Sequence, residues 1–282
     1  MYSEAYSDVS IRVRIQLKMR VLLFSVRDMT STIGSLSMSS ATGKKILSMI
    51  REGDYAHAGE EEAIRLTVSN INPDPARKIL DMGCGLGGTA DFISREGLGQ
   101  TTGIDIDPDT IQYASANYPL SSFVCCPAGE ASRHLPAEFS LVFIFNALYS
   151  FPDQIQALRE ACKVTLPGSE MRVFEYTAKS ETPEVMEFLE RYGRGKWRPI
   201  MMDQAQLMFH ESGWSLKETT DLSDSYERWY ADLVRKIVNK RDIIVQQAGE
   251  RWYEYAVWRY QELLDVIRAG VIGGAIFRAT RE

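Results

Sequence analysis

The chain has 282 residues and a formal charge of −6, from 32 basic and 38 acidic side chains. Apolar residues make up 45% of it and charged residues 25%, which excludes a wholly disordered or collagen-like chain. The mild acidic excess disfavours a general nucleic-acid-binding protein, because such proteins normally carry a basic surface. The four cysteines have neither the number of a disulfide framework nor the spacing of metal ligands. We therefore expect no metal site and a reducing, cytoplasmic setting.

The first 58 residues read as an N-terminal extension that covers the rest of the protein. Residues 11–21 alternate apolar and polar side chains with the period of a strand, and a run rich in serine and threonine follows from Thr30 to Thr42. The early apolar run from Val21 to Val26 is too short to span a membrane, and acidic residues stand where a signal peptide needs basic ones. We expect neither a membrane segment nor a signal peptide.

From residue 59 onward, short apolar runs alternate with helical segments. A helix is expected over 59–68, where three glutamates suit a helix N-terminus. The expected strands are 78–82, 102–106, 123–126, 139–146 and 171–176, and the helices between them are 89–96, 108–117 and 152–165, the last ended by a Pro-Gly pair. This βαβ rhythm is typical of a parallel sheet covered by helices on both faces.

The C-terminal part predicts a helix over 203–212, a strand over 214–220 and a last strand over 271–279. Between the last two strands, the insertion 221–270 contains two helical patterns rich in tyrosine and tryptophan. At helical spacing, such residues are more often core than binding site.

The strongest functional signal is in 79–88, where an apolar strand runs into a glycine-rich turn and then a helix. Glycines permit the tight turn and let a ligand approach the backbone closely. Asp105, at the tip of the next strand, lies 20 residues beyond Gly85 and can accept both hydroxyls of an adenosine ribose. Asp107 instead precedes Pro108 and is the expected N-cap of the following helix. The segment predicts a site for an adenosine-containing ligand.

Two adenosine cofactors fit the glycine pattern. Gly83, Gly85 and Gly88 match the dinucleotide fingerprint G-x-G-x-x-G, which alone is a weak signal. Gly83, Gly85 and Gly87 also match G-x-G-x-G, and Asp81 precedes them by two residues. A carboxylate there would repel a pyrophosphate but attract a cation, such as the sulfonium and amino groups of S-adenosylmethionine. The residues favour S-adenosylmethionine over NAD.

At these residues the sequence resembles the class I S-adenosylmethionine-dependent methyltransferases. Their first motif reads like Leu80-Asp81-Met82-Gly83-Cys84-Gly85-Leu86-Gly87, and their second like Gly103-Ile104-Asp105-Ile106. The resemblance is good over 78–179 and loose elsewhere. It implies an α/β, Rossmann-like, seven-stranded and mostly parallel sheet with helices on both faces, formed by residues 59–282 together with a helical lid. It also implies S-adenosyl-L-methionine as the donor and S-adenosyl-L-homocysteine as the product.

The resemblance further implies the residues of the donor site. The loop from Gly83 to Gly87 would bind the methionine part, Asp105 the ribose, and Glu130 the adenine, although the family more often has aspartate there. Asn146 ends the fourth strand, which lies under the methyl donor in such folds. The implied cofactor-binding residues are Asp81, Gly83, Cys84, Gly85, Gly87, Asp105, Ile106, Glu130, Ala131 and Asn146.

Methyl transfer needs alignment more than a nucleophilic side chain or a metal, and a base helps when the acceptor must lose a proton. The family often carries a His or Tyr ahead of the helix before its first strand, near the donor methyl. Here His57 and Tyr55 stand at that place, and Tyr149 follows the fourth strand. These three are the candidate catalytic residues, and a packed tyrosine without function is the rival interpretation.

The segments 179–202 and 221–270 are the expected acceptor-side lid. Arg198 beside Trp197 is a candidate clamp for a carboxylate or phosphate, and Tyr176 and Tyr226 complete the candidate substrate-binding residues. Aromatic residues here could also contact an ammonium group.

The layout of this region is loosely similar to glycine, sarcosine and dimethylglycine N-methyltransferases and to phosphoethanolamine methyltransferases. That resemblance favours a small acceptor over a protein or nucleic acid, and in particular an amine bearing an anionic group. An O- or C-methyltransferase of a secondary metabolite, an NAD-dependent oxidoreductase and a non-catalytic binding module stay open as alternatives. We expect a monomer or homodimer.

Overall fold

The structure is a computed structural model that describes residues 36–193 and 196–282. The alternating segment 11–21 lies outside the described residues, as does the first part of the serine- and threonine-rich run, up to residue 35. A compact unit runs from Met38 to Glu282. Part of the expected extension 1–58 therefore belongs to this unit, and it includes the helix α3 (Ala41–Arg51). None of the helices in the two described ranges is long and apolar enough to cross a bilayer.

The centre of the unit is one sheet whose main path has the strand order β3-β2-β1-β4-β5-β8-β7. The strands are β1 (Lys78–Met82), β2 (Gln100–Asp105), β3 (Ser122–Cys125), β4 (Phe139–Phe145), β5 (Thr165–Ala178), β7 (Trp214–Asp221) and β8 (Gly273–Arg281), and the short β6 (Ile200–Met201) pairs with β5. β8 pairs antiparallel with both β5 and β7, and the pairs along the rest of the path are parallel. The seven-stranded, mostly parallel sheet predicted from the sequence is confirmed.

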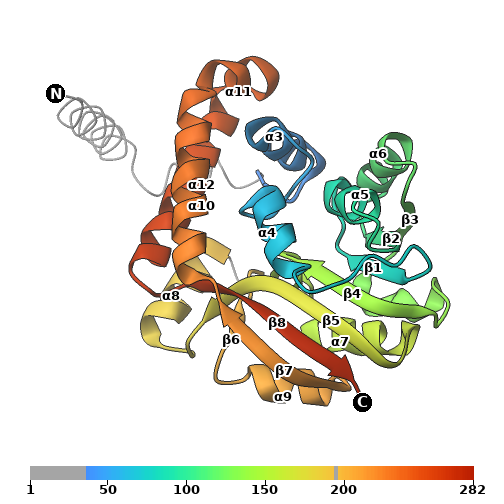
Figure 1. The fold of residues 1–282 in the computed structure, drawn as a ribbon. Coiled ribbons are helices and arrows are strands. Elements are labelled where there is room, and N and C mark those ends of the chain that lie inside the picture. The colour runs from blue at the N-terminus through green and yellow to red at the C-terminus, as the bar shows by residue number, and fades with distance from the viewer. Residues whose placement is uncertain (1–35, 194–195) are drawn as a thin grey trace. The chain divides into compact units, whose positions relative to one another are not determined.

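Helices cover both faces of the sheet, with α4 and α5 on one side and α7 and α9 on the other (Figure 1). The remaining helices are α4 (Glu60–Thr67), α5 (Gly88–Arg95), α6 (Pro108–Asn117), α7 (Gln154–Val164), α8 (Pro183–Gly193), α9 (Ala205–Glu211), α10 (Ser223–Asn239), α11 (Arg241–Ala248) and α12 (Glu250–Arg268), with short 3₁₀ turns η1 (Ala128–Arg133) and η2 (Leu148–Ser150).

The strand order reverses between β1 and β4, so the crevice beyond their carboxyl ends is the expected ligand position in such a sheet.

Two stretches differ from the sequence-based expectation. β5 begins at Thr165, directly after α7, although Pro167 and Gly168 had indicated a turn there. Strand β5 tolerates the proline because Leu166 to Gly168 are exposed and lie outside the regular register, which starts at Glu170. The insertion holds three helices rather than two, since α11 separates α10 from α12.

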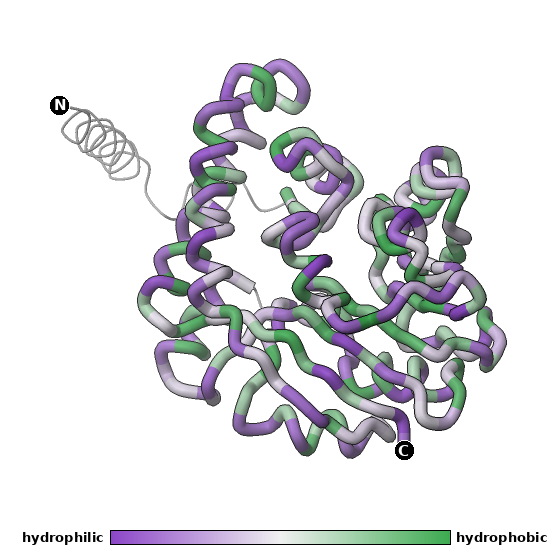
Figure 2. Tube along the Cα trace, in the orientation of Figure 1, coloured by the Kyte–Doolittle hydropathy of each residue, from purple (hydrophilic) through white to green (hydrophobic). Residues whose placement is uncertain are grey.

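The insertion builds the lid predicted as a helical element, which we define as α10, α11 and α12. Its buried residues on α10 are Tyr226, Trp229, Tyr230, Leu233 and Ile237, which recur every three or four positions. Figure 2 shows hydrophobic and hydrophilic residues interleaved along α10 and α12, as expected for helices with one inward stripe. Lys240 at the end of α10 donates to Met49 O at 2.9 Å and to Glu52 Oε1 at 2.7 Å, so the lid is fastened to the end of α3.

Candidate active site

The glycine-rich turn follows the buried strand β1. Gly83, Gly85 and Gly87 have φ values of +80°, +55° and +93°, which side chains with a Cβ rarely adopt. A Cβ on Gly87 would lie 2.9 Å from the Phe123 ring, whereas a Cβ on Gly85 would have no atom within 4 Å. Gly87 is therefore a packing glycine, and Gly85 leaves the backbone open to an approaching molecule.

Asp105 at the end of β2 points back to this turn. Its Oδ2 accepts the Gly85 N–H at 3.0 Å, and its Oδ1 accepts the Asp107 N–H at 3.0 Å. Lys44 on α3 places its Nζ 3.3 Å from both carboxylate oxygens. Asp107 accepts from the backbone of Asp109 and caps α6, as predicted, while the side chain of Ile106 is exposed.

Asp81 lies in β1 just before the turn and is 1% exposed. Its Oδ2 has no hydrogen-bond partner among the residues that the structure describes. Burial, and then the neighbouring charge of Asp105, raise the pKa of Asp81 from 3.8 to about 7. A buried carboxylate oxygen without a partner beside an open glycine turn is the arrangement that a bound cation would satisfy.

Three further members of the expected donor site behave differently. The Cys84 thiol is buried, and burial raises its pKa well above 9.0, so it stays protonated. Ala131 is fully buried in η1, whereas the half-exposed Glu130 side chain pairs with Arg133 at 2.7 Å. A contact from Glu130 to an adenine would require the carboxylate to turn away from Arg133.

A buried polar network lies where β4 and β5 end. Asn146 adopts a φ of +44°, and its Oδ1 accepts the Tyr226 hydroxyl at 3.1 Å. Its Nδ2 donates to Glu175 Oε1 at 3.4 Å. Glu175 is 0% exposed and also accepts the backbone N–H groups of Tyr149 at 3.0 Å and Tyr176 at 2.8 Å. Burial raises the pKa of Glu175 to about 8, against the opposing effect of these hydrogen bonds.

The same strand ends gather a set of aromatic side chains that we call the tyrosine cluster. Its members are Tyr149, Tyr176, Tyr192, Trp197, Tyr226, Tyr230 and Tyr260. Ring centroids lie 4.8 Å apart for Tyr176 and Trp197, 5.2 Å for Tyr149 and Tyr176, and 5.6 Å for Tyr176 and Tyr226. Four residues predicted separately from the sequence, namely Tyr149, Tyr176, Trp197 and Tyr226, are therefore neighbours.

His57 is 2% exposed and packs against Phe145 and Phe174 at the ends of β4 and β5, with centroid distances of 5.1 and 5.9 Å. Its Nδ1 lies 3.1 Å from Ala58 O and its Nε2 lies 3.1 Å from Thr89 Oγ1. Burial lowers the pKa of His57 to about 3, so the ring is neutral and weakly basic. Both nitrogens are engaged within the protein, which fits a positioning role better than proton transfer.

Tyr55 donates its hydroxyl to Glu61 Oε1 at 3.2 Å. Its ring is 5.8 Å from that of His57. Burial, and then the charge of Glu61, raise the pKa of Tyr55 to about 12. The phenol is therefore a poor proton donor, and its hydrogen bond ties the loop after α3 to α4.

The side chain of Arg198 lies apart from the other expected acceptor residues, although its backbone N–H donates to Tyr149 O at 2.9 Å. Its side chain is exposed, and its Nη1 donates to Pro152 O at 3.2 Å. It lines a surface cavity of about 370 Å³ whose other walls include Met186, Leu207 and Met208. The guanidinium is thus separated from the buried tyrosine cluster, and the clamp expected at this position is not formed by Arg198 in this arrangement.

Sequence reasoning missed three charged residues, namely the buried Arg51 and Glu175 and the half-buried Arg259. Arg51 shares the inward stripe of α3 with Leu47 and Ile50, and this inward position is the signal that could have marked it. Glu175 interrupts an apolar strand and could have been marked for that reason. The position of Arg259 depends on how α12 packs, which periodicity alone does not give.

Comparison with known proteins places this geometry in a family. A family model described as a methyltransferase domain matches residues 80–173, the part that carries the glycine turn, Asp105 and β4. The chain contains a class I S-adenosylmethionine-dependent methyltransferase domain.

Relatives named for different acceptor atoms resemble this chain. Norajmaline N-methyltransferase of Rauvolfia serpentina is 29% identical over 132 residues, which cover 44% of each chain. The O-methyltransferase resE of Aspergillus sclerotiorum is 26% identical over 208 residues, or 70% of this chain and 75% of the relative. The match thus spans less than half of the first relative and three quarters of the second.

A solved structure shares the fold over most of the chain. Haemonchus contortus phosphoethanolamine N-methyltransferase 2, in complex with phosphomonomethylethanolamine and S-adenosylhomocysteine, superposes with a TM-score of 0.75 at 16% identity. The superposition covers 92% of this chain and 60% of the nematode protein. At this identity the likeness concerns the fold alone.

Proposed function

We propose that the protein transfers a methyl group from S-adenosylmethionine to a small-molecule acceptor. The observation that carries the proposal is the buried Asp81 carboxylate, whose Oδ2 has no partner among the described residues, beside the open Gly85 backbone and with Asp105 at the next strand end. The Asp81 carboxylate can pair with an ammonium group, and Gly85 lets a ligand approach the backbone closely. Asp105 can accept hydrogen bonds from two ribose hydroxyls. The family match, and the nematode methyltransferase that was solved with S-adenosylhomocysteine bound, support the same donor.

The donor supplies a methyl group on positively charged sulfur, so this chain's residues mainly align the reactants and exclude water. We assign Gly83, Cys84, Gly85 and Gly87 to the methionine part, Asp105 and Ile106 to the ribose, and Glu130 and Ala131 to the adenine. Asn146 would hold the strand end beneath the reacting carbon through its links to Tyr226 and Glu175. His57 would act as a neutral wall of the site rather than as its base.

The acceptor would lie against Tyr149, Tyr176, Trp197 and Tyr226, between the ends of β4 and β5 and the lid. Among small acceptors we favour an amine nitrogen of an anionic or zwitterionic molecule. Aromatic faces attract an ammonium group, and the Glu175 carboxylate at the same place can take up a proton when an amine loses one. The O-methyltransferase relative makes an oxygen acceptor the second candidate.

The test is a screen for release of S-adenosylhomocysteine with amines, amino acids, phosphorylated amines and phenols. The proposal expects turnover on anionic amines and little on phenols. Turnover on phenols alone would move the acceptor atom to oxygen. Intact donor binding without turnover on any compound would contradict the proposed acceptor classes, and absence of donor binding would contradict the methyltransferase assignment itself.

A further inference from the structure

Arg51, the last residue of α3, is a buried cation with too few partners. Its side chain is 1% exposed, and Nη1 donates to Glu60 Oε1 at 3.1 Å. Nε and Nη2 have no hydrogen-bond partner in the part of the chain that the structure describes. Buried donors that have lost water and gained nothing destabilise a fold, so a ligand that accepts from them would bind favourably.

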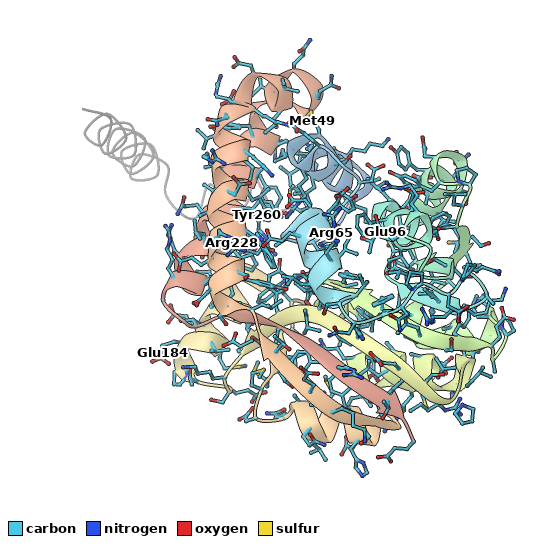
Figure 3. All side chains as sticks on the ribbon, viewed as in Figure 1. Met49, Arg65, Glu96, Glu184, Arg228 and Tyr260 are labelled. Carbon is cyan, nitrogen blue, oxygen red and sulfur yellow. The ribbon has the colours of Figure 1, made fainter. Side chains whose placement is uncertain are left out.

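Phenols of the tyrosine cluster lie close enough to this guanidinium to act on its charge. Burial opposes the charge, but Glu60 and the phenols of Tyr230, Tyr260 and Tyr176 raise the pKa of Arg51 above its ordinary value. The group therefore stays charged. Figure 3 shows Tyr260 on the side of the lid that faces α3 and α4. Three elements, namely α3, the lid and the end of β5, bring hydrogen-bond donors to one buried place.

This place adjoins the proposed point of methyl transfer. Tyr176 is the residue after Glu175, and its hydroxyl is hydrogen-bonded to that of Tyr230. On the other side, the charge of Arg51 acts on His57, which packs on Phe145 at the end of β4. Arg51 is therefore within electrostatic reach both of His57 on the donor side and of the aromatic rings on the acceptor side.

Another guanidinium near the cluster, that of the half-buried Arg259, already has partners within the protein. Arg259 on α12 stacks on the Tyr192 ring, with 3.3 Å from Cζ to the centroid, and its Nη1 donates to Tyr192 O at 2.5 Å. Its position fixes the packing of α12 against α8. Arg51, by contrast, has hydrogen-bonding capacity left over.

We propose that Arg51 binds the anionic group of the methyl acceptor, with the hydroxyls of Tyr230 and Tyr260 as further donors. The inference rests on the proposed function and adds the residue that selects the substrate class. A guanidinium edge with adjacent hydroxyls matches the oxygens of a phosphate or a carboxylate. Because α3 and the lid both contribute, an acceptor bound there would be enclosed by both.

The experiment compares the wild-type protein with Arg51→Met, Arg51→Lys and the control Arg228→Met. Arg228 is an exposed arginine on α10 that pairs with Glu62, so the control removes a charge at the boundary between the lid and α4 without touching the cluster. Each protein is first titrated with S-adenosylhomocysteine in a calorimeter. The loaded protein is then titrated with inorganic phosphate and with acetate at constant ionic strength, and KM and kcat are measured for anionic acceptors and their neutral analogues.

The proposal expects phosphate or acetate to bind the wild-type and Arg228→Met proteins, and to bind Arg51→Met at least tenfold more weakly, with equal affinity for S-adenosylhomocysteine. The KM for anionic acceptors should rise ten- to a hundredfold in Arg51→Met, as for the loss of one or two charge-assisted hydrogen bonds, while kcat changes less. Arg51→Lys, which keeps the charge without the planar fork, should lie between the two.

Several outcomes would overturn the inference: no anion binding by the loaded wild-type protein, equal anion binding by the variants, or an equal rise in KM for neutral analogues. If Arg51→Met does not fold, Arg51→Lys decides, because unchanged anion binding in that variant would also overturn it. Failure of the wild-type protein to bind S-adenosylhomocysteine would instead contradict the proposed function, so the two failures are distinguishable.

Discussion

At the scale of single residues, the site consists of buried charges that the fold leaves incompletely paired. Among the described residues, Asp81 has an oxygen without a partner, and Arg51 has two nitrogens without one. Glu175 is fully buried, and backbone N–H groups rather than a cation accompany it. Such groups lower the free energy of unfolding of the free protein, and a ligand that pairs with them recovers that free energy as binding.

The first prediction concerns Asp81→Asn. Because the folded pKa of about 7 lies above the ordinary 3.8, the folded state binds the proton more tightly than the unfolded state. The contribution of Asp81 to stability is therefore present below pH 4 and is lost as the pH rises through 7, by up to about 4 kcal/mol. The free energy of unfolding of the variant, compared with that of the wild-type protein, should therefore increase as the pH rises from 5 to 8.

Urea denaturation at pH 5 and pH 8 measures this difference. Glu175, whose pKa of about 8 is also raised, acts in the same direction in both proteins and cancels in the comparison. A variant that loses stability relative to the wild-type protein on going from pH 5 to pH 8 would show that Asp81 is paired in the fold.

At the scale of elements, α3 and the lid make polar contacts with the proposed donor site and its surroundings. Lys44 on α3 pairs with Asp105, and both side chains are 11% exposed. The lid meets α4 through Trp229, whose Nε1 donates to Glu62 Oε2 at 2.8 Å. The elements that cover the site are thus held by polar contacts to the residues that we assign to the donor site or its neighbours.

The second prediction is that Lys44→Met strengthens binding of S-adenosylmethionine two- to fivefold. Asp105 must give up its pair with Lys44 to accept the ribose hydroxyls, and a partly screened ion pair contributes about 1 kcal/mol or less. Calorimetric titration checks the value, with Lys45→Met, the neighbouring lysine on α3, as the control. Weaker binding in Lys44→Met alone would mean that Lys44 contacts the donor directly.

The third prediction concerns the contact between α4 and α10. Gly59 precedes α4 with a φ of +79°, and a Cβ there would lie 2.6 Å from the Trp229 ring. Gly59→Ala should lower the free energy of unfolding by about 2–4 kcal/mol, through backbone strain and overpacking. Gly97→Ala is the matched control, because its φ is +70° but a Cβ would meet nothing within 4 Å, and it should cost only about 1–2 kcal/mol.

Denaturant titration of both variants separates the two costs. An equal loss of stability in Gly59→Ala and Gly97→Ala would show that Trp229 does not pack tightly against the start of α4.

At the scale of the whole molecule, local patterns in the sequence predicted the sheet well. Strand β1 has the same bounds as predicted, because an apolar run followed by glycines is a local signal. The helices α3 and α8 and the strand β6 were not predicted. Their stability depends on packing against the lid and on pairing with the end of β5, and neither contact is encoded at short range.

The residues of the candidate site likewise fall into two groups, those that local sequence motifs predict and those that only the fold brings together. Most of the proposed donor residues follow one another in two motifs, so they can be found without the structure. The proposed acceptor residues come from α3, η2, β5, the segment before β6 and the lid, and residues as distant as Arg51 and Tyr260 come within electrostatic reach only when the chain has folded. The sequence predicted Arg198 as an acceptor residue because it follows Trp197. In the fold, however, its guanidinium donates to Pro152 O.

We expect the glycine turn and Asp105 to bind S-adenosylmethionine, and calorimetric titration of the wild-type and Asp105→Ala proteins with S-adenosylmethionine and NAD measures this binding. Asp109→Ala, an exposed acidic residue on α6, serves as the control. We predict that the wild-type and control proteins bind S-adenosylmethionine and not NAD, and that Asp105→Ala binds it at least tenfold more weakly, as for two lost charge-assisted hydrogen bonds. Binding of NAD without binding of S-adenosylmethionine would show that the site takes a dinucleotide, and an unchanged dissociation constant in Asp105→Ala would show that Asp105 does not bind the donor.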